Sequence, residues 1–147
     1  MQVEEYLNDI VEREGTVHLT LLDPASQSPD EAGEIALAVT EGGTDAIIVG
    51  GSTGAGGVLL DQTLLKIKEQ TDKPTILFPG NASGVSVHAD AIFFMILLNS
   101  RDVNYITASS LDVLIDPVVS FKITTSLITK VYDAANNWKM CVLNNEN

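Results

Sequence analysis

The sequence of 147 residues has a single cysteine, Cys141, and only 8 basic residues against 20 acidic ones. One cysteine permits no internal disulfide, which is typical of a reducing compartment, so we expect a cytoplasmic protein. The formal net charge of −12 argues against nucleic acid or an anionic membrane surface as a partner. It also disfavours a phosphate-bearing substrate unless a metal ion or local hydrogen-bond donors offset the charge.

Long apolar runs and targeting signals are missing as well. The longest apolar run, residues 91–98, is far shorter than the ~20 residues that a membrane-spanning helix requires. Residues 1–5 are acidic rather than basic, so they do not indicate a secretory signal peptide. With 45% apolar and 19% charged residues, the composition predicts one globular domain with a single hydrophobic core of adequate size.

The most informative stretch is residues 45–54, where the apolar run Ala46–Val49 leads into a glycine-rich turn with two hydroxyl residues. A short apolar run without alternation is typical of a parallel strand that helices cover. Gly50 and Gly51 let the backbone turn sharply and come close to a ligand. We therefore expect Ser52 at the carboxyl end of a parallel strand, where such sheets bind their ligands.

Two other predicted strands end on polar side chains. Residues 17–22 are followed by Asp23, and residues 75–78 are followed, after a Pro-Gly turn, by Asn81. The carboxyl ends of parallel strands lie along one edge of a sheet. We therefore expect Asp23, Ser52 and Asn81 to line one common site.

Helical patterns separate the predicted strands. Ser28, Pro29 and Glu31 form a capping box that begins a helix, and a glycine pair ends it. This alternation is typical of right-handed crossovers around a parallel sheet, although residues 80–89 contain too much glycine and serine for a third crossover helix. The predicted helices span residues 3–14, 29–41 and 60–70, the last capped by Asp61, and the predicted strands span residues 17–22, 46–49, 75–78 and 91–95.

Asp23 and Ser52 together offer one carboxylate and one hydroxyl. They cannot enclose a divalent ion alone, but Mg²⁺ accepts such a partial set when substrate phosphates and water complete its octahedron. The alternative is structural, with Asp23 capping the turn before Pro24 and Ser52 satisfying loop backbone. Asn81 is likewise either a substrate-binding donor or an αL turn residue. The residues alone leave these alternatives open, and they select no catalytic acid, base or nucleophile.

Other functions of the glycine loop are excluded by its spacing. No Gly-Lys-Ser/Thr follows it, as a P-loop requires, and a dinucleotide fingerprint would need a glycine in place of Leu59. His18 and His88 have neither metal-ligand spacing nor a nucleophile partner. We interpret His18 as a hydrogen-bonded structural histidine and His88 as a loop residue. Arg101 and Lys130 can pair with anions, but nothing in their spacing selects them.

Four motifs occur in collinear order, at residues 18–24, 43–54, 76–81 and 89–101. Together they resemble the geranylgeranylglyceryl phosphate synthase family, from residue 3 to about residue 106. The resemblance implies an α/β fold of the TIM-barrel (β/α)8 type in which an extended segment replaces one helix. We expect residues 1–106 to form about the first four βα units of such a barrel. Residues 107–147 are expected to be a divergent segment, with a β-hairpin and a disordered tail from Asn144.

The resemblance also implies an activity and a cofactor. The family transfers a geranylgeranyl group from its diphosphate to the C3 hydroxyl of sn-glycerol 1-phosphate, which begins ether-lipid synthesis. Its Mg²⁺ ligands correspond to Asp23 and Ser52, the pair at the predicted strand ends. Mg²⁺ would neutralise the departing diphosphate while the glycerol hydroxyl attacks a cation-like prenyl carbon. The implied partners are these two substrates.

Two departures from the family pattern stand out. The family motif Asp-Pro-Asp-Lys reads Asp23-Pro24-Ala25-Ser26 here, so an acid and a lysine are missing. From residue 101 onward the chain has no glycine, and its only glutamate is Glu146. The glycine-rich loops that hold glycerol phosphate in the family therefore have no counterpart, whereas a closed barrel usually takes ~200 residues or more.

Half a barrel leaves apolar edges on its first and fourth strands. Either residues 107–147 or a second copy of the chain must cover these edges, so a homo-oligomer is one expectation. Three interpretations follow: a truncated or frame-shifted gene product, a half-barrel that dimerises, and a relative retained as a non-catalytic module. Such a module would bind Mg²⁺ and phosphate or form oligomers, and only the dimerising half-barrel could restore catalysis.

Overall fold

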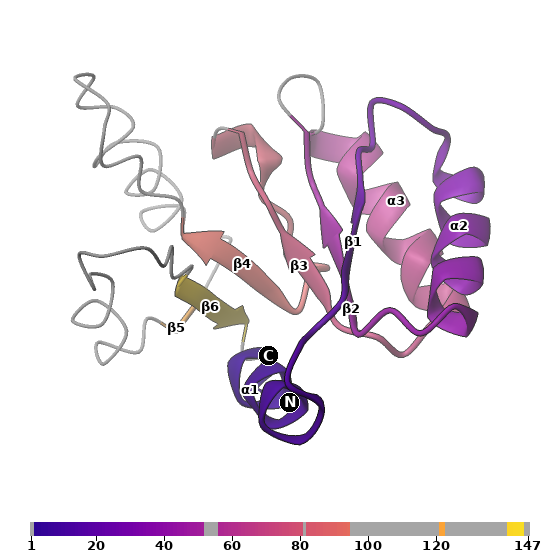
Figure 1. Cartoon of the computed structure of the whole chain (residues 1–147). Helices are drawn as coiled ribbons and strands as arrows, with labels where there is room; N and C mark the ends of the chain where they lie inside the picture. The colour runs from indigo at the N-terminus through magenta and orange to yellow at the C-terminus, as the bar shows by residue number, and fades with distance from the viewer. Residues whose placement is uncertain (1, 52–55, 81, 95–120, 123–140, 146–147) are drawn as a thin grey trace.

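The computed structural model describes residues 2–51, 56–80, 82–94, 121–122 and 141–145. Three helices and one sheet account for most of them (Figure 1). In chain order the elements are α1 (Val3–Glu14), β1 (Leu19–Leu22), α2 (Pro29–Glu41), β2 (Ala46–Val49), α3 (Gly57–Gln70), β3 (Thr75–Leu77), the 3₁₀ helix η1 (Ala82–Gly84), β4 (Ala91–Phe94), β5 (Phe121–Lys122) and β6 (Cys141–Asn145).

The sheet has the strand order β1-β2-β3-β4-β6-β5. The pairs β1–β2, β2–β3 and β3–β4 are parallel, as predicted for successive crossovers, and α2 and α3 cover one face. The third crossover contains only η1, which confirms that no full helix forms there. The four parallel strands and their crossovers are thus the arrangement expected of about the first four units of a (β/α) barrel.

Alternation along the strands divides the core into two layers. Ile47, Leu77 and Ile92 point toward α2 and α3, where they pack with residues such as Leu64 and Ala36. Leu22 and Val49 belong to the same layer, whereas a second group of strand residues faces the other side and packs with α1. This second layer contains Val3, Ala46, Ile76, Ala91 and Phe93, with Leu7, Leu19, Ile48 and Phe78 packed against it.

Helix α1 lies at the amino ends of the parallel strands (Figure 1). Its Tyr6 hydroxyl donates to the carbonyl oxygen of Asp45, directly before β2, at 3.1 Å. Gly15 ends the helix at φ 78°, a left-handed conformation that glycine adopts readily. None of the helices in the described part of the chain combines the length and apolar character that a membrane crossing requires.

The predicted start of α3 was wrong. The helix begins at Gly57 with Gly56 as its N-cap, and Asp61 is not a cap but accepts a hydrogen bond from the Ser86 hydroxyl. The two glycines indicated a loop, but Gly56 instead allows the start of α3 to lie close to η1. A Cβ atom there would overlap with the carbonyl oxygen of Ser83 in η1.

Strand β6 corrects a second expectation. It pairs antiparallel with β4, so that Asn144 lies opposite Ala91 and Cys141 lies opposite Phe94. Asn144 and Asn145 thus belong to a strand and not to the disordered tail that the sequence predicted. The pairing partner lies about 50 residues away in sequence, and local composition carries no signal for such a contact.

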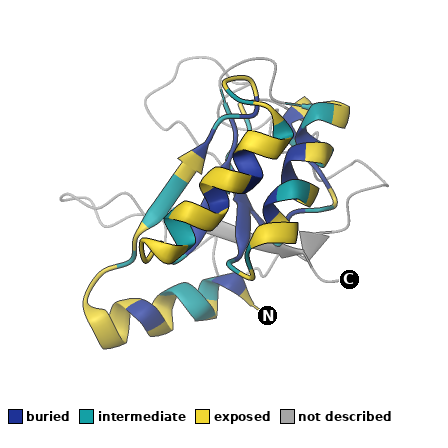
Figure 2. Ribbon diagram, turned by 90° about the vertical axis from the view of Figure 1, so that its right-hand side faces the viewer, coloured by how far each residue is buried: buried dark blue, intermediate teal, exposed yellow. Residues whose placement is uncertain are grey.

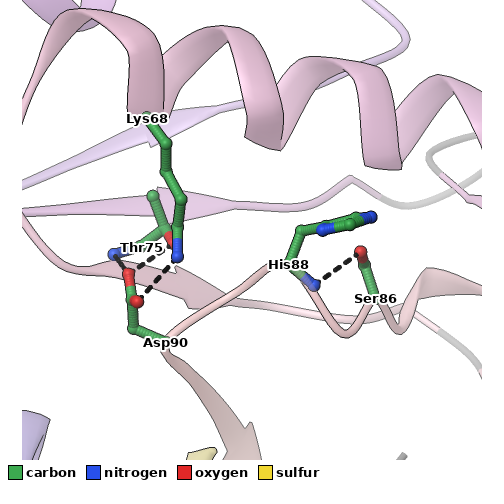
Figure 3. A network of polar contacts seen from close by, with 5 residues as sticks. All are labelled: Lys68, Thr75, Ser86, His88 and Asp90. Carbon is green, nitrogen blue, oxygen red and sulfur yellow. Dashed lines mark hydrogen bonds and ion pairs between the residues drawn. The ribbon is translucent and has the colours of Figure 1, made fainter. Parts of the chain in front are cut away.

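A polar network at the amino ends ties α3 to β3 and β4 (Figure 3). Asp90, directly before β4, accepts hydrogen bonds from the backbone N–H and the hydroxyl of Thr75 at 2.8 Å each. Its other oxygen pairs with the Lys68 ammonium at 2.7 Å. Since Thr75 is fully buried, Asp90 satisfies donors that water cannot reach.

Replacing Asp90 is therefore expected to lower the free energy of unfolding. In Asp90→Ala the buried Thr75 donors lose their acceptors, which costs about 1–3 kcal/mol. Asp90→Asn keeps one acceptor and loses mainly the charge pair, so its loss should be smaller. Urea denaturation measures both, with exposed Asp72→Ala as the control. Equal stability of Asp90→Ala and Asp72→Ala would contradict this role.

The capping box of α2 is confirmed. The Ser28 hydroxyl accepts a hydrogen bond from the Glu31 N–H at 3.3 Å, and the Glu31 carboxylate accepts from the Ser28 N–H at 2.8 Å. The hydrogen bond from the Ser28 backbone, and then that from its hydroxyl, lower the pKa of Glu31 below its usual 4.5. The ionised carboxylate therefore stabilises the folded state.

This stabilisation should depend on pH. A lowered carboxyl pKa contributes stability above pH 4.5, the usual value, and the contribution disappears as pH falls through the lower folded-state pKa. We expect Glu31→Gln to have a lower melting temperature than the original chain at pH 7. The difference in melting temperature should disappear in acid, because glutamine resembles the protonated carboxyl group. Thermal unfolding across this pH range measures it, and a difference independent of pH would refute it.

Candidate functional site

Asp23 directly follows β1 and is half-buried at the carboxyl edge of the sheet. Its Oδ1 accepts a hydrogen bond from the Ala25 N–H at 2.9 Å, and its carbonyl oxygen accepts from the Ser26 N–H at 2.9 Å. The turn-capping role that the sequence left open is therefore present. The cap uses only Oδ1, and no described residue donates a hydrogen bond to Oδ2, which leaves this oxygen able to ligate a cation.

The glycine turn after β2 approaches this carboxylate closely. The Gly50 N–H donates to the Leu22 carbonyl at 3.0 Å, which continues the β1–β2 pairing beyond the strands. A Cβ atom at Gly51 would overlap with both oxygens of Asp23, and one at Gly50 would overlap with the Phe78 carbonyl oxygen. Glycine is required at position 50, because the clash there is with backbone, and at position 51 a side chain would displace the carboxylate. The two glycines thus bring three strand ends together.

The candidate metal and substrate residues are only partly described. Asp23 lies where the sequence predicted it, beside Gly51, the residue that precedes Ser52. Ser52 and Asn81 lie outside the described residues, as do Arg101 and Lys130. The ligand role of Ser52 and the substrate role of Asn81 therefore stay predictions.

An apolar surface adjoins the carboxylate. Leu19 and Leu21 alternate along β1, so their side chains share one face of the sheet, and Asp23 follows directly after the strand. On that face the rings of Phe78 and Phe93 meet edge to face, with centroids 6.0 Å apart and an interplanar angle of 85°. The site thus joins one anionic group to an apolar wall.

The start of α3 adds hydrogen-bond donors that the sequence analysis missed. Its N-cap, Gly56, carries no side chain to cap the helix, and no acidic residue occupies the first turn. Free N–H groups at a helix start favour an anion such as a phosphate group. Reading the pair Gly56-Gly57 as a helix start, rather than as loop, is the signal that could have revealed these donors.

The donor set fits a metal that shares its coordination with a substrate. No group of three or more His, Cys, Asp or Glu side chains suited to a metal occurs in the described ranges. Zinc and calcium sites usually need more protein ligands. One carboxylate oxygen suits Mg²⁺ that is bound together with phosphate oxygens and water.

The two histidines lie outside this site. His18 is at the amino end of β1, where its Nδ1 lies 3.1 Å from the Thr44 hydroxyl, which confirms a structural role. His88 lies in the loop before β4, and its backbone N–H donates to the Ser86 hydroxyl at 3.2 Å (Figure 3). Neither ring contacts Asp23 among the contacts of the described residues.

Comparison with known proteins identifies the family of this chain. A model of the PcrB family matches residues 8–144. The geranylgeranylglyceryl phosphate synthase of Methanococcoides burtonii is 81% identical over 106 residues, which are 72% of this chain and 43% of that protein. The synthase of Methanosarcina mazei is 66% identical over the same length. The chain thus spans less than half the length of these curated relatives.

Solved structures agree with the observed fold. The Thermoplasma acidophilum (S)-3-O-geranylgeranylglyceryl phosphate synthase, solved with its substrate sn-glycerol-1-phosphate, matches with a TM-score of 0.68 and 42% identity. It covers 74% of this chain, and this chain covers 45% of it. The wild-type GGGPS of Thermoplasma volcanium matches with a TM-score of 0.71 and 46% identity, over 76% of this chain and 44% of that protein. The resemblance that the four motifs indicated is confirmed: the chain belongs to the PcrB family.

Proposed function

We propose that this chain binds the diphosphate of geranylgeranyl diphosphate. It thereby takes part in the transfer of the geranylgeranyl group to the C3 hydroxyl of sn-glycerol 1-phosphate. The observation that carries the proposal is the contact between Gly51 and the Asp23 carboxylate. It brings the loop bearing the second predicted ligand to the first. The names of the similar proteins, and the glycerol phosphate in one of them, support the two substrates.

In this proposal Asp23 and Ser52 hold Mg²⁺ beside the diphosphate. The ion supplies, when bound, the positive charge that a departing diphosphate needs. The N–H groups at the start of α3 add donors for phosphate oxygens, which offsets the net charge of −12. The apolar wall of Leu21, Phe78 and Phe93 keeps water from one side of the reacting carbon.

The part of the site that would bind the acceptor, sn-glycerol 1-phosphate, has the fewest candidate residues. Asn81 is the proposed substrate-binding residue, while the segment after residue 101 has no glycine for a loop that would hold glycerol phosphate. This absence of glycine favours a second candidate function. In it the chain binds Mg²⁺ and phosphate without catalysis, in the cytoplasm.

Calorimetric titration with inorganic diphosphate and Mg²⁺ tests the shared part of both candidates. We expect Asp23→Asn to weaken binding at least about tenfold, because contacts to charged groups contribute ~1.5–3 kcal/mol. Gly51→Ala should also weaken it, since the new methyl group displaces the carboxylate. Asp72→Asn and Gly42→Ala are matched controls, an exposed acid and a helix-end glycine with room for a methyl group.

An activity assay separates the two candidates. Labelled geranylgeranyl diphosphate, sn-glycerol 1-phosphate and Mg²⁺ should yield a prenylated glycerol phosphate if the chain is a transferase. Diphosphate binding without product would reject the transferase and support the binding module. Equal diphosphate binding by the original chain and Asp23→Asn would reject both.

A further inference from the structure

The connection between β3 and β4 contains no full helix, yet it packs as part of the core. Ala89 is buried in the layer that α2 and α3 form with the sheet, and Val85 packs against the same layer. Figure 2 shows the strands behind α2 and α3 in dark blue, so this layer is shielded from solvent. The connection is therefore held in one place, although only η1 in it is helical.

Contacts near both ends of α3 join this connection to the helix. At the start, a Cβ atom on the N-cap Gly56 would overlap with the Ser83 carbonyl oxygen, so the two backbones lie against each other. Near the end, the Lys68 ammonium pairs with Asp90 at 2.7 Å. Figure 3 shows the stretch between Ser86 and Asp90 running alongside the helix. The connection thus follows α3 from the carboxyl edge of the sheet to the amino edge.

Between these two contacts lies a hydrogen bond to a carboxylate. The Ser86 hydroxyl donates to Asp61 Oδ1 at 2.5 Å, and it accepts from the His88 N–H at 3.2 Å (Figure 3). Ser86 is only 3% exposed, so water does not compete for its hydroxyl. Hydrogen bonds to charged groups are stronger than those between neutral groups. The bond between Asp61 and Ser86 therefore fixes where the connection lies along α3.

The same connection touches both ends of the glycine turn after β2. At the start of the turn, Gly50 lies against the Phe78 carbonyl oxygen, and at its end Gly56 lies against the Ser83 carbonyl oxygen. Both neighbours are backbone atoms, which cannot rotate away as the end of a side chain can. A shift of the connection along α3 therefore moves the turn, which includes Gly51 beside the carboxylate of the site.

We propose that Asp61 is a positioning residue for the metal and diphosphate site, and that it acts through Ser86. The bond holds residues 82–86 against the start of α3, and the backbone of this stretch holds the far end of the glycine turn. The effect reaches the Asp23 carboxylate through Gly51 and does not require Asp61 to contact the ligand. The inference rests on the proposed function, because the ligand whose affinity it concerns is the diphosphate.

Calorimetric titration with Mg²⁺ and inorganic diphosphate measures this effect. Ser86→Ala and Asp61→Ala both break the bond, so each should weaken diphosphate binding by between about twofold and about thirtyfold, the usual range for residues that act on a site through others. Asp61→Asn should bind nearly as well as the original chain, because its amide oxygen accepts the same hydrogen bond. The double variant Asp61→Ala/Ser86→Ala should bind no worse than either single variant, since both changes remove one bond.

Asp90→Asn is the matched control at the other end of the connection. It removes one negative charge, as Asp61→Asn does, and it weakens the contact with Lys68 at the amino edge of the sheet. We expect it to lower the free energy of unfolding and to leave diphosphate binding unchanged. Binding is compared at a temperature where every variant is folded, so a loss of stability alone does not change the measured affinity.

Three results of this titration would overturn the inference. If Ser86→Ala lowers the free energy of unfolding but binds diphosphate as the original chain does, the bond is structural only. If Asp61→Asn loses binding and Ser86→Ala does not, the carboxylate acts on the ligand directly. If Asp90→Asn loses as much binding as Ser86→Ala, any damage to the connection weakens the site and Asp61 has no special role.

Amide resonances of the ligand-free, ¹⁵N-labelled chain keep this inference separate from the proposed function. If the original chain binds no diphosphate, the proposed function fails, but the resonances still report whether the connection positions the turn. Ser86→Ala should shift the resonances of Gly51 and Gly56, and Asp61→Asn should leave them in place. Unshifted Gly51 and Gly56 resonances in Ser86→Ala would overturn the positioning role itself.

Discussion

The contact between Gly51 and the Asp23 carboxylate is the interaction on which the site depends. It exists because β1 and β2 are parallel and in register, so that their carboxyl ends reach the same edge of the sheet. A side chain at position 51 would displace the carboxylate, so glycine is what lets the two lie together. The apolar strands thus determine where a single acidic group meets the glycine turn after β2.

The polar side chains at the amino and carboxyl ends of the parallel strands differ in their partners. At the amino ends the polar side chains are engaged with one another: Asp90 binds Lys68 and Thr75, and His18 binds Thr44. At the carboxyl ends, Asp23 Oδ2 accepts no hydrogen bond from a described residue, and α3 begins without a side-chain cap. The stabilising contacts and the candidate ligand-binding groups therefore lie at opposite ends of the strands, as in barrels generally.

Local patterns predicted the elements whose signals are local. The capping box predicted α2, and the apolar run predicted β2. The position of Asp23 directly after a strand predicted that Asp23 lies at the carboxyl edge of the sheet. The start of α3 was missed because Gly56 serves a tertiary contact with Ser83, which composition cannot express. Strand β6 was missed in part because its partner is distant in sequence. The roles of Ser52 and Asn81 remain predictions.

The central claim is that the Asp23 carboxylate and the glycine turn form one metal site. Manganese, a paramagnetic substitute for magnesium, tests it most directly when titrated with diphosphate into ¹⁵N-labelled protein. We predict that the amide resonances of Ala25 and Gly51 broaden first, and that Asp23→Asn abolishes this broadening. Broadening at Asp90 and other amino-end residues, with Gly51 unaffected, would contradict the account.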